Sequence, residues 1–432
     1  MGVYEKPQGY IPRVVDAQIE RYLRIFGAIE IAGAKWCGKT WAALQHGSSV
    51  SYVDENIELA KADPSMMLLG ERPHVIDEWQ LVPSIRDVVR HEVDRSRAVR
   101  GAFVLTGSST PFGEGTERPL HSGAGRIGRV RMRTMSLLES GQSCGRVSLE
   151  GLFEGVFEPC KVDKDTFGLV EAACKGGWPE AVDLPVSDAQ LIARDYLRRI
   201  FSESVPSLGF DGDVARRMVG SIARNLGQAT TYKTIVADMY GAEDTPESFM
   251  DVEKAALYLS LLKSMYLVEE IPGWVPPARS RKRFATKPKR YLTDPSLAVA
   301  MLGLSPQSCL SDWQTFGLVL ENLVMRDLLV YTEALDSIDE HPVRYYRDDS
   351  GLEVDAIVQL ADGRWAAIEV KVSEDKVADG VASLKRLRAK LLKNSQAQVD
   401  EPTFMAVVTG NGEYARQVEP GIYVIPVRAL GK

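Results

Sequence analysis

Cysteine is scarce in this sequence. The five cysteines are scattered along 432 residues, and no two of them form a C-x-x-C pair. That pattern indicates neither a disulfide framework nor a zinc ribbon. Long apolar runs are missing too, since no stretch approaches the roughly 18 uncharged apolar residues of a membrane helix and the first residues lack the apolar core of a secretory signal. We therefore expect a soluble, cytoplasmic protein with no membrane contact.

Positive charge is not in excess either. Lysine and arginine number 52 against 59 acidic residues, which gives a net charge of −7. A protein dedicated to coating nucleic acid usually has a binding domain with a pI above about 9. The chain is also too long for one hydrophobic core, so two or three domains are expected. We predict a first domain over 1–150, a helical domain over 151–290 and a third domain over 291–432.

A phosphate-binding loop follows the first apolar run. Residues 26–32 read as a buried strand, and the next eight residues complete a G-x-x-x-x-G-K-T pattern before a helix begins. The glycines let backbone N–H groups face phosphate oxygens, while the lysine adds a charge and the threonine a magnesium ligand. The predicted nucleotide-binding residues are Gly33, Ala34, Lys35, Trp36, Cys37, Gly38, Lys39 and Thr40. ATP and Mg²⁺ are the expected ligands.

Two carboxylates and a hydroxyl group are the predicted partners of this loop. The apolar run His74–Ile76 ends in Asp77 and Glu78. In P-loop enzymes the first carboxylate holds the magnesium shell and an adjacent Glu activates water, so we assign these roles to Asp77 and Glu78. Another apolar run, 102–105, ends in Thr106 and Ser108. We predict that Ser108 reaches the γ-phosphate or the water, with Thr106 as the alternative and an ordinary strand end as the competing interpretation.

The order of these motifs resembles a prokaryotic family of AAA-superfamily ATPases that carry a C-terminal domain of undefined role. The shared motifs include Tyr10–Arg13, I-D-E-W-Q, L-T-G-S-S, Gly125-Arg126, Met135–Glu139 and Gly176–Glu180. The resemblance implies that Arg126 is the arginine finger, acting within one chain or from a neighbouring copy in a homo-oligomer. Capping of a loop by Arg126 is the alternative, and Arg129, Arg131 and Arg133 compete for the role.

The P-loop departs from the family pattern at Trp36 and Cys37. Both glycines, Lys39 and Thr40 are retained, so the prediction of nucleotide binding stands. A cysteine beside a helix N-terminus can have a lowered thiol pKa. Redox inhibition through Cys37 is therefore one hypothesis, and a cysteine that only fills space is the other.

The middle of the chain is predicted to be helical and to end in a wing. A short helix near 229–236, a longer one over 251–266 and a strand at 267–271 give the outline of a winged helix. The run from 279 to 290 has seven basic residues and no acidic one, which leaves the rest of the chain at −14. Non-specific contact with DNA phosphates is one interpretation, and a solvated loop or a site for acidic protein or nucleotide is the other. The candidate contacts are Arg279, Arg281, Lys282, Arg283, Lys287, Lys289 and Arg290.

The last third resembles restriction-endonuclease-like cores. Asp355 lies on one predicted strand, an Asp-Gly turn follows, and Glu369 and Lys371 share one face of the next strand. Such carboxylates hold magnesium while the lysine positions water, and Glu321 on the preceding helix matches an auxiliary carboxylate. The alternatives are a polar strand face without function and a nuclease-type fold that only binds a partner.

These observations favour an α/β protein with an AAA-type P-loop core, a winged-helix-like middle and a nuclease-like C-terminal domain. The favoured function is a Mg²⁺-dependent ATPase that couples hydrolysis to DNA-related work. The alternative is a nucleotide-controlled signalling or scaffold switch whose C-terminal domain only binds a protein partner.

Overall fold

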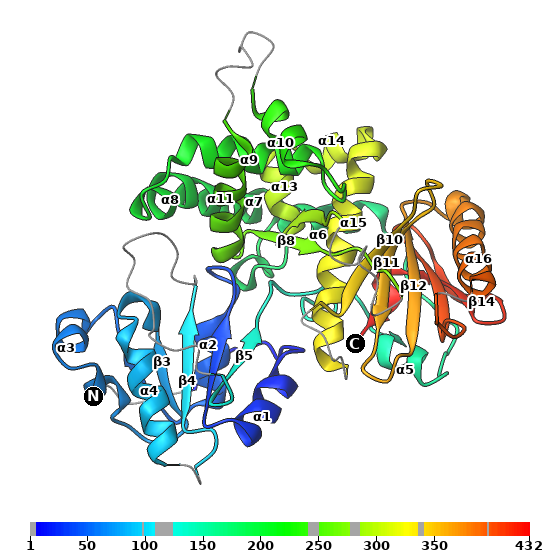
Figure 1. Ribbon diagram of the computed structural model, residues 1–432. Helices are drawn as coiled ribbons and strands as arrows, with labels where there is room; N and C mark the ends of the chain where they lie inside the picture. Colours follow the sequence, from blue (N-terminus) through cyan, green and yellow to red (C-terminus); the bar gives the residue numbers. More distant parts are fainter. Residues whose placement is uncertain are drawn as a thin grey trace. The chain divides into compact units, whose positions relative to one another are not determined.

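The computed structural model describes residues 6–96, 99–108, 124–240, 250–276, 286–335, 341–394 and 397–432 (Figure 1). The chain forms two compact units. Unit 1 contains Met1–Thr134 and Ser260–Leu267, and unit 2 contains Met135–Leu259 and Val268–Lys432. Among the residues described, no helix is long and apolar enough to cross a membrane.

Unit 1 is built on a parallel sheet with the strand order β2-β3-β4-β1-β5 (Figure 1). Its strands are β1 (Ala28–Ala32), β2 (Ser49–Tyr52), β3 (His74–Asp77), β4 (Phe103–Gly107) and β5 (Ile127–Arg131). The connections contain α1 (Asp16–Ile25), α2 (Lys39–His46), α3 (Ile57–Ala62), η1 (Pro64–Leu68), η2 (Trp79–Leu81) and α4 (Ser84–Arg95).

Helices cover both faces of this sheet, which explains why its central strands are apolar throughout. Every residue of β1 and β4 is buried. Ile29 of β1 packs in a cluster with Ile19 of α1 and Ala42 of α2, whereas the adjacent Ala28 packs in a second cluster with Val89 of α4. Near-continuous apolar strands are typical of parallel sheets buried on both faces. The predicted α/β class is confirmed, and the structure shows that the sheet of unit 1 is parallel.

The first part of unit 2 is mainly helical. Several helices begin at a residue whose side chain accepts a hydrogen bond from the first turn, among them Asp165, Asp211 and Thr231. The elements are β6 (Val147–Ser148), α5 (Leu149–Phe153), β7 (Cys160–Lys161), α6 (Thr166–Lys175), α7 (Val186–Arg199), α8 (Val205–Ser207), α9 (Gly212–Arg224), α10 (Tyr232–Met239), α13 (Pro295–Met301), α14 (Pro306–Ser311) and α11 (Val252–Ser264), which belongs to this unit as far as Leu259.

A two-stranded antiparallel sheet follows α11 in the sequence. It pairs β8 (Val268–Ile271) with β9 (Lys289–Leu292), with Val268 opposite Leu292 and Ile271 opposite Lys289. Helices followed by a strand pair are present as predicted, and the winged-helix assignment stays a proposal. Residues 277–285, which hold the first part of the basic run, lie outside the described residues.

The second part of unit 2 is a mixed sheet with the strand order β10-β11-β12-β13-β15-β14-β7. β10 to β12 form an antiparallel meander, and β12 and β13 are parallel across the α16 connection. Helices α15 and α16 flank the sheet (Figure 1). The elements are α15 (Trp313–Tyr331), β10 (Val343–Arg347), β11 (Glu353–Gln359), β12 (Trp365–Lys371), α16 (Val377–Lys393), β13 (Phe404–Thr409), β14 (Tyr414–Glu419), β15 (Ile422–Pro426) and β16 (Leu430–Gly431).

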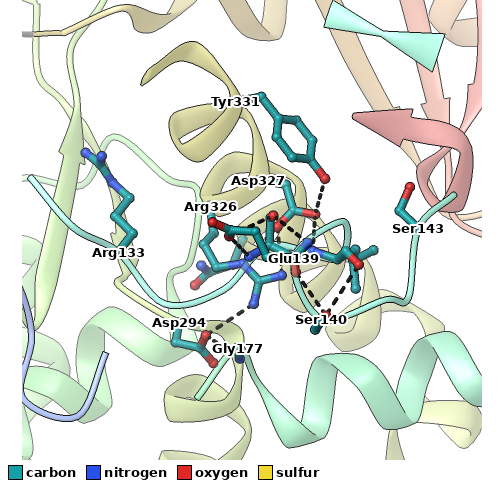
Figure 2. Close-up of polar contacts among 12 residues, drawn as sticks. Arg133, Glu139, Ser140, Ser143, Gly177, Asp294, Arg326, Asp327 and Tyr331 are labelled. Carbon is teal, nitrogen blue, oxygen red and sulfur yellow. Dashed lines mark hydrogen bonds and ion pairs between the residues drawn. The ribbon is translucent and has the colours of Figure 1, made fainter. Parts of the chain in front are cut away.

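Three charged side chains are buried together beside α15 (Figure 2). The Arg326 guanidinium lies 2.7 Å from Asp327 Oδ1 and 3.2 Å from Asp294 Oδ2. None of the three is more than 3% exposed. The Leu137 amide donates a hydrogen bond to Asp327 Oδ2 at 3.1 Å. Burial raises the pKa of Asp327, and the nearby Arg326 opposes that rise. These charges are tolerated in the core because each has a partner there.

Two of the motifs on which the family resemblance depends, 135–139 and 176–180, lie side by side in this region. The Met135 amide donates to the Gly177 carbonyl at 2.6 Å. A Cβ atom on Gly177 would stand 2.0 Å from the Met135 carbonyl oxygen, so the close approach of the two backbones requires glycine at this position. The Met135–Glu139 segment is therefore fixed in the interior of unit 2.

Replacing Arg326 by methionine should destabilise unit 2 strongly. The Arg326→Met variant leaves Asp294 and Asp327 buried without their cation, which should lower the free energy of unfolding by about 3–5 kcal/mol. The control Arg198→Met removes an arginine that is 71% exposed and should cost less than about 1 kcal/mol. Chemical denaturation at pH 7 measures both. Equal losses in the two variants would contradict the assigned role.

Candidate functional site

The predicted phosphate-binding loop connects β1 to α2 at the carboxyl edge of the unit 1 sheet. Gly38 has φ 99° and Trp36 has φ 64°, so the loop turns through left-handed backbone at two residues. A Cβ atom on Gly33 would stand 2.0 Å from the Met132 carbonyl oxygen. Both glycines of the motif are therefore required, Gly38 by conformation and Gly33 by the close passage of the chain after β5.

Lys39 and Thr40 begin α2 and point in different directions. The buried Lys39 ammonium donates a hydrogen bond to the Ala34 carbonyl at 2.7 Å, across the loop. Thr40 Oγ1 donates to Asp77 Oδ1 at 3.0 Å. The loop thus places a cation, a hydroxyl group and the N-terminus of a helix together, which is the chemistry that binds a phosphate and its magnesium ion.

The predicted carboxylates lie beside the loop, at the ends of neighbouring strands. Asp77 ends β3, and Thr106 of β4 donates a hydrogen bond to it. Burial raises the pKa of Asp77, and the hydrogen bonds from Thr106 and Thr40 oppose the rise. Glu78 follows with φ 55°, and Ser108 Oγ donates to its Oε2 at 3.2 Å. Ser108 therefore contacts the predicted base, whereas Thr106 contacts the predicted metal ligand.

Arg126 lies at the wrong edge of the sheet for a finger that acts within one chain. β1 and β5 are parallel with Ala28 opposite Ile127, so Arg126 precedes the amino end of β5. The phosphate-binding loop follows the carboxyl end of β1, about 16 Å away at roughly 3.3 Å per residue. The Arg126 side chain instead pairs with Asp94 at 2.8 Å. We therefore correct the prediction that Arg126 is the arginine finger for the loop of its own chain.

Two of the competing arginines are placed differently. Arg131 ends β5 opposite Ala32, which puts it at the same edge as the loop, and Arg133 follows two residues later. The Arg131 guanidinium stacks 4.0 Å from the centre of the Tyr266 ring, and Arg129 donates to the Tyr266 hydroxyl at 2.6 Å. Strand direction thus favours the two arginines at the carboxyl end of β5 over Arg126.

Arg13 is a residue of this site that sequence reasoning missed. Its buried guanidinium donates to the Cys37 carbonyl at 2.9 Å and to the Arg133 carbonyl at 2.8 Å. It therefore ties the loop to the chain that follows β5. The motif around Arg13 was visible in the sequence, but nothing local marks an arginine that binds backbone more than twenty residues away.

Cys37 fills space under the loop. Its thiol has no exposed surface and its Sγ lies 3.6 Å from the Met132 carbonyl oxygen. Thiol reagents and oxidants act on accessible thiolates. This geometry favours the space-filling interpretation of Cys37 over redox inhibition.

The predicted DNA contacts differ in whether the structure describes them and in how exposed they are. Arg279, Arg281, Lys282 and Arg283 lie outside the described residues, and Lys287 is exposed. Lys289 and Arg290 belong to β9 and are 2% and 4% exposed. Arg290 pairs with Glu270 of β8 at 3.0 Å. The expectation that Lys289 and Arg290 contact phosphates is therefore wrong, because both side chains are buried and paired with carboxylates of unit 2.

Lys289 lies among the residues predicted to form a nuclease-like centre. Its ammonium is 2.8 Å from Glu353, 3.1 Å from Glu321 and 3.5 Å from Asp355. The Tyr291 hydroxyl donates to the same Glu321 oxygen at 2.6 Å. Burial, followed by repulsion from Asp355, raises the pKa of Glu321 to about 7. The structure thus brings Glu321 and Asp355 together as predicted and adds a lysine between them.

Glu369 and Lys371 complete the group on β12. They form an ion pair with each other, and the Lys371 ammonium is 4.0 Å from Asp355. Asp355 accepts a hydrogen bond from the Val370 amide at 2.9 Å, which fixes it beside β12. Burial and repulsion from Asp355 raise the pKa of Glu369 to about 7. All four predicted residues are neighbours, and each of the three carboxylates is already paired with a lysine.

The two candidate metal sites differ in how they fit a cation. Thr40 and Asp77 offer a hydroxyl and a carboxylate oxygen beside the phosphate-binding loop, a donor set that suits Mg²⁺. The carboxylates around Asp355 do not fit a divalent ion in the same way, because the Lys289 ammonium already lies among them. In the described part of the chain, no group of three or more His, Cys, Asp or Glu side chains is arranged to hold a metal.

Comparison with known domains divides the chain into three parts. Residues 26–140 match the model of an AAA domain, which includes the loop and both carboxylates described above. Residues 166–308 match one domain of unknown function, DUF8612, and residues 316–430 match another, DUF4143. No curated protein matches the sequence.

Several solved structures are similar to the chain at low identity. One is a Walker-type ATPase of Pyrococcus abyssi, with 12% identity, a TM-score of 0.44, and coverage of 70% of this chain and 99% of that one. A second is the RuvB Holliday junction branch migration motor of Thermotoga maritima, with 14% identity, a TM-score of 0.29, and coverage of 70% and 99%. A third is the Orc1 protein of Aeropyrum pernix in complex with DNA, with 16% identity, a TM-score of 0.27, and coverage of 68% and 94%. Of the three parts with a matching domain model, residues 26–140 are the part whose model describes a known domain type, an AAA domain.

Proposed function

We propose that this chain binds ATP with Mg²⁺ at the Gly33–Thr40 loop and hydrolyses it. One observation carries the proposal. The hydroxyl groups of Thr40 and Thr106 both donate to the carboxylate of Asp77, and Glu78 is the next residue after Asp77 in the sequence. These groups come from three separate segments and meet at the edge where the loop lies. The AAA-domain match over the same residues supports the proposal.

Each side chain has a defined task in this mechanism. Lys39 leaves the Ala34 carbonyl to contact the outer phosphates, and Thr40 and Asp77 hold the magnesium ion, which would neutralise charge on the phosphate oxygens. Glu78 accepts the proton of the attacking water. Ser108, at 3.2 Å from Glu78, orients that carboxylate. An arginine then stabilises the charge that develops on the transferred group, and Arg131 or Arg133 is better placed for this within one chain than Arg126.

We further propose that hydrolysis is coupled to DNA-related work through the basic segment that ends at Lys287. Its support is compositional, because the run from 279 to 287 has five basic residues and no acidic one. The second candidate is a nucleotide-controlled switch whose C-terminal domain binds a partner without cutting nucleic acid. The ammonium of Lys289 among the nuclease-like carboxylates favours this second candidate for the C-terminal domain.

Glu78→Gln should separate ATP binding from turnover. The amide cannot accept the proton, so kcat should fall by about 10²–10⁴-fold while the Kd for ATP changes little. Lys39→Ala should instead weaken ATP binding by at least about tenfold, because it removes the charge that faces the phosphates. Phosphate release and nucleotide titration measure the two effects. The matched control is Glu71→Gln, an exposed carboxylate of unit 1, and hydrolysis by Glu78→Gln at the control rate would refute the assigned base.

Arg13→Gln should weaken ATP binding although Arg13 is not expected to touch the nucleotide. The shorter amide cannot span the Cys37 and Arg133 carbonyls, so the loop loses its tie to the segment after β5. We expect the Kd for ATP to rise about tenfold, or ~1.4 kcal/mol. The control is Arg24→Gln, an exposed arginine on α1. Equal affinity of the two variants, each with its thermal midpoint recorded, would show that Arg13 does not position the loop.

Coupling to DNA predicts that DNA stimulates the ATPase. Turnover should rise with single- or double-stranded DNA, and the stimulation should decrease with salt because phosphate contacts release counterions. The triple variant Arg281→Ala/Lys282→Ala/Arg283→Ala should lose the stimulation and keep basal turnover. If DNA does not change the turnover of the parent protein, the nucleotide-controlled switch is favoured. If DNA stimulates the triple variant as much as the parent, residues 281–283 are not the DNA contact.

A further inference from the structure

We infer that the carboxylates of Glu321, Glu353 and Asp355 form a cation site whose resident is the Lys289 ammonium, so that the nuclease-like centre contains an internal ammonium in place of a divalent metal. This inference concerns the C-terminal centre alone and is independent of ATP hydrolysis. Three features support it: the carboxylates that bind the ammonium, the contacts that fix its strand, and the repulsion between the ammonium and a metal ion.

The donors of the Lys289 ammonium match the acceptors around it. A lysine ammonium has three N–H donors and no acceptor. The Lys289 nitrogen has three carboxylate neighbours at 2.8, 3.1 and 3.5 Å, one on α15 and two on β11. The Lys289 side chain itself is only 2% exposed. The number of acceptors thus matches the number of donors of a buried ammonium.

The ammonium stays charged and is held in place. Burial alone would lower the pKa of Lys289, but the attraction of Glu321, Asp355 and Glu353 outweighs it and raises the pKa. The strand that carries Lys289 is fixed to α15 by the two residues Tyr291 and Leu292. Tyr291 binds Glu321, and the Leu292 amide and carbonyl both bind the Asn322 side chain, at 3.2 and 2.8 Å. A tethered cation has a high effective concentration at its site, which disfavours a competing ion from solution.

A metal ion in this centre would be repelled by two ammonium groups. If Asp355 and Glu369 shared it, the Lys289 ammonium would lie 3.5 Å from Asp355, and the Lys371 ammonium would be paired with Glu369. These two lysines already offset part of the negative charge of Glu321, Glu353, Asp355 and Glu369. A divalent ion would add like charge in a buried environment, where such repulsion is costly.

Manganese binding in the absence of nucleotide tests the inference. Mn²⁺ prefers oxygen ligands and is counted by electron paramagnetic resonance. The parent protein and Asp355→Asn should bind the same number of Mn²⁺ ions. Lys289→Met should bind one more ion per chain, because it empties the site and leaves its oxygens in place. That extra ion should be absent from Lys289→Met/Asp355→Asn.

The matched control is Lys393→Met, which removes an exposed lysine of the same unit and should gain no ion. A Mn²⁺ ion that the parent loses on Asp355→Asn would overturn the inference, because the native centre would then hold a metal. A folded Lys289→Met protein without an additional ion would overturn it too. Circular dichroism checks folding, and if Lys289→Met does not fold, the comparison of the parent with Asp355→Asn decides the question by itself.

Discussion

The carboxylate of Asp77 joins the three segments on which the nucleotide site depends. Thr40 comes from the start of α2, Asp77 from the end of β3 and Thr106 from the end of β4, and the two hydroxyl groups donate to the same carboxylate. Because β4 lies between β1 and β3, this arrangement needs the sheet order that the structure has. A change in strand order would separate the loop from its carboxylate, so the parallel sheet is a condition for the chemistry.

Unit 2 depends on α15 in a comparable way. This helix contributes Glu321 to the lysine-filled cluster, Asn322 to the backbone of β9, and Arg326 and Asp327 to the buried ion network. Glu321 and Asp327 are about 9 Å apart along the helix axis at 1.5 Å per residue. One helix therefore contacts both β9 and the Met135–Glu139 segment. The buried cations Lys289 and Arg326 are both matched by carboxylates, and their charge is better understood as fixing which segments meet than as adding stability.

The parts of the site that the sequence predicts are those in which position along the chain decides position in space. The Gly33–Thr40 loop and the two carboxylates after β3 follow buried strands of a parallel sheet, so they meet at its carboxyl edge. Arg126 precedes a strand, which places it at the amino edge of the sheet and away from the loop of its own chain, and its action from a neighbouring copy stays a prediction. Arg13 could not be assigned from the sequence, because its partners are backbone carbonyls far along the chain. The carboxylates near Asp355 were grouped correctly from strand alternation, and the lysine among them came from another strand with no local signal.

The basic run from 279 to 290 shows why a count of charges does not describe a surface. In the sequence its seven cations look equivalent, but Lys289 and Arg290 are buried and paired with carboxylates. Five cations are left to contact phosphates, which lowers the largest number of counterions that DNA could displace. Lys289 and Arg290 also anchor the end of this run, because Lys289 binds Glu321 of α15 and Arg290 binds Glu270 of β8. The cations that remain therefore precede, in the sequence, a strand that is fixed in unit 2.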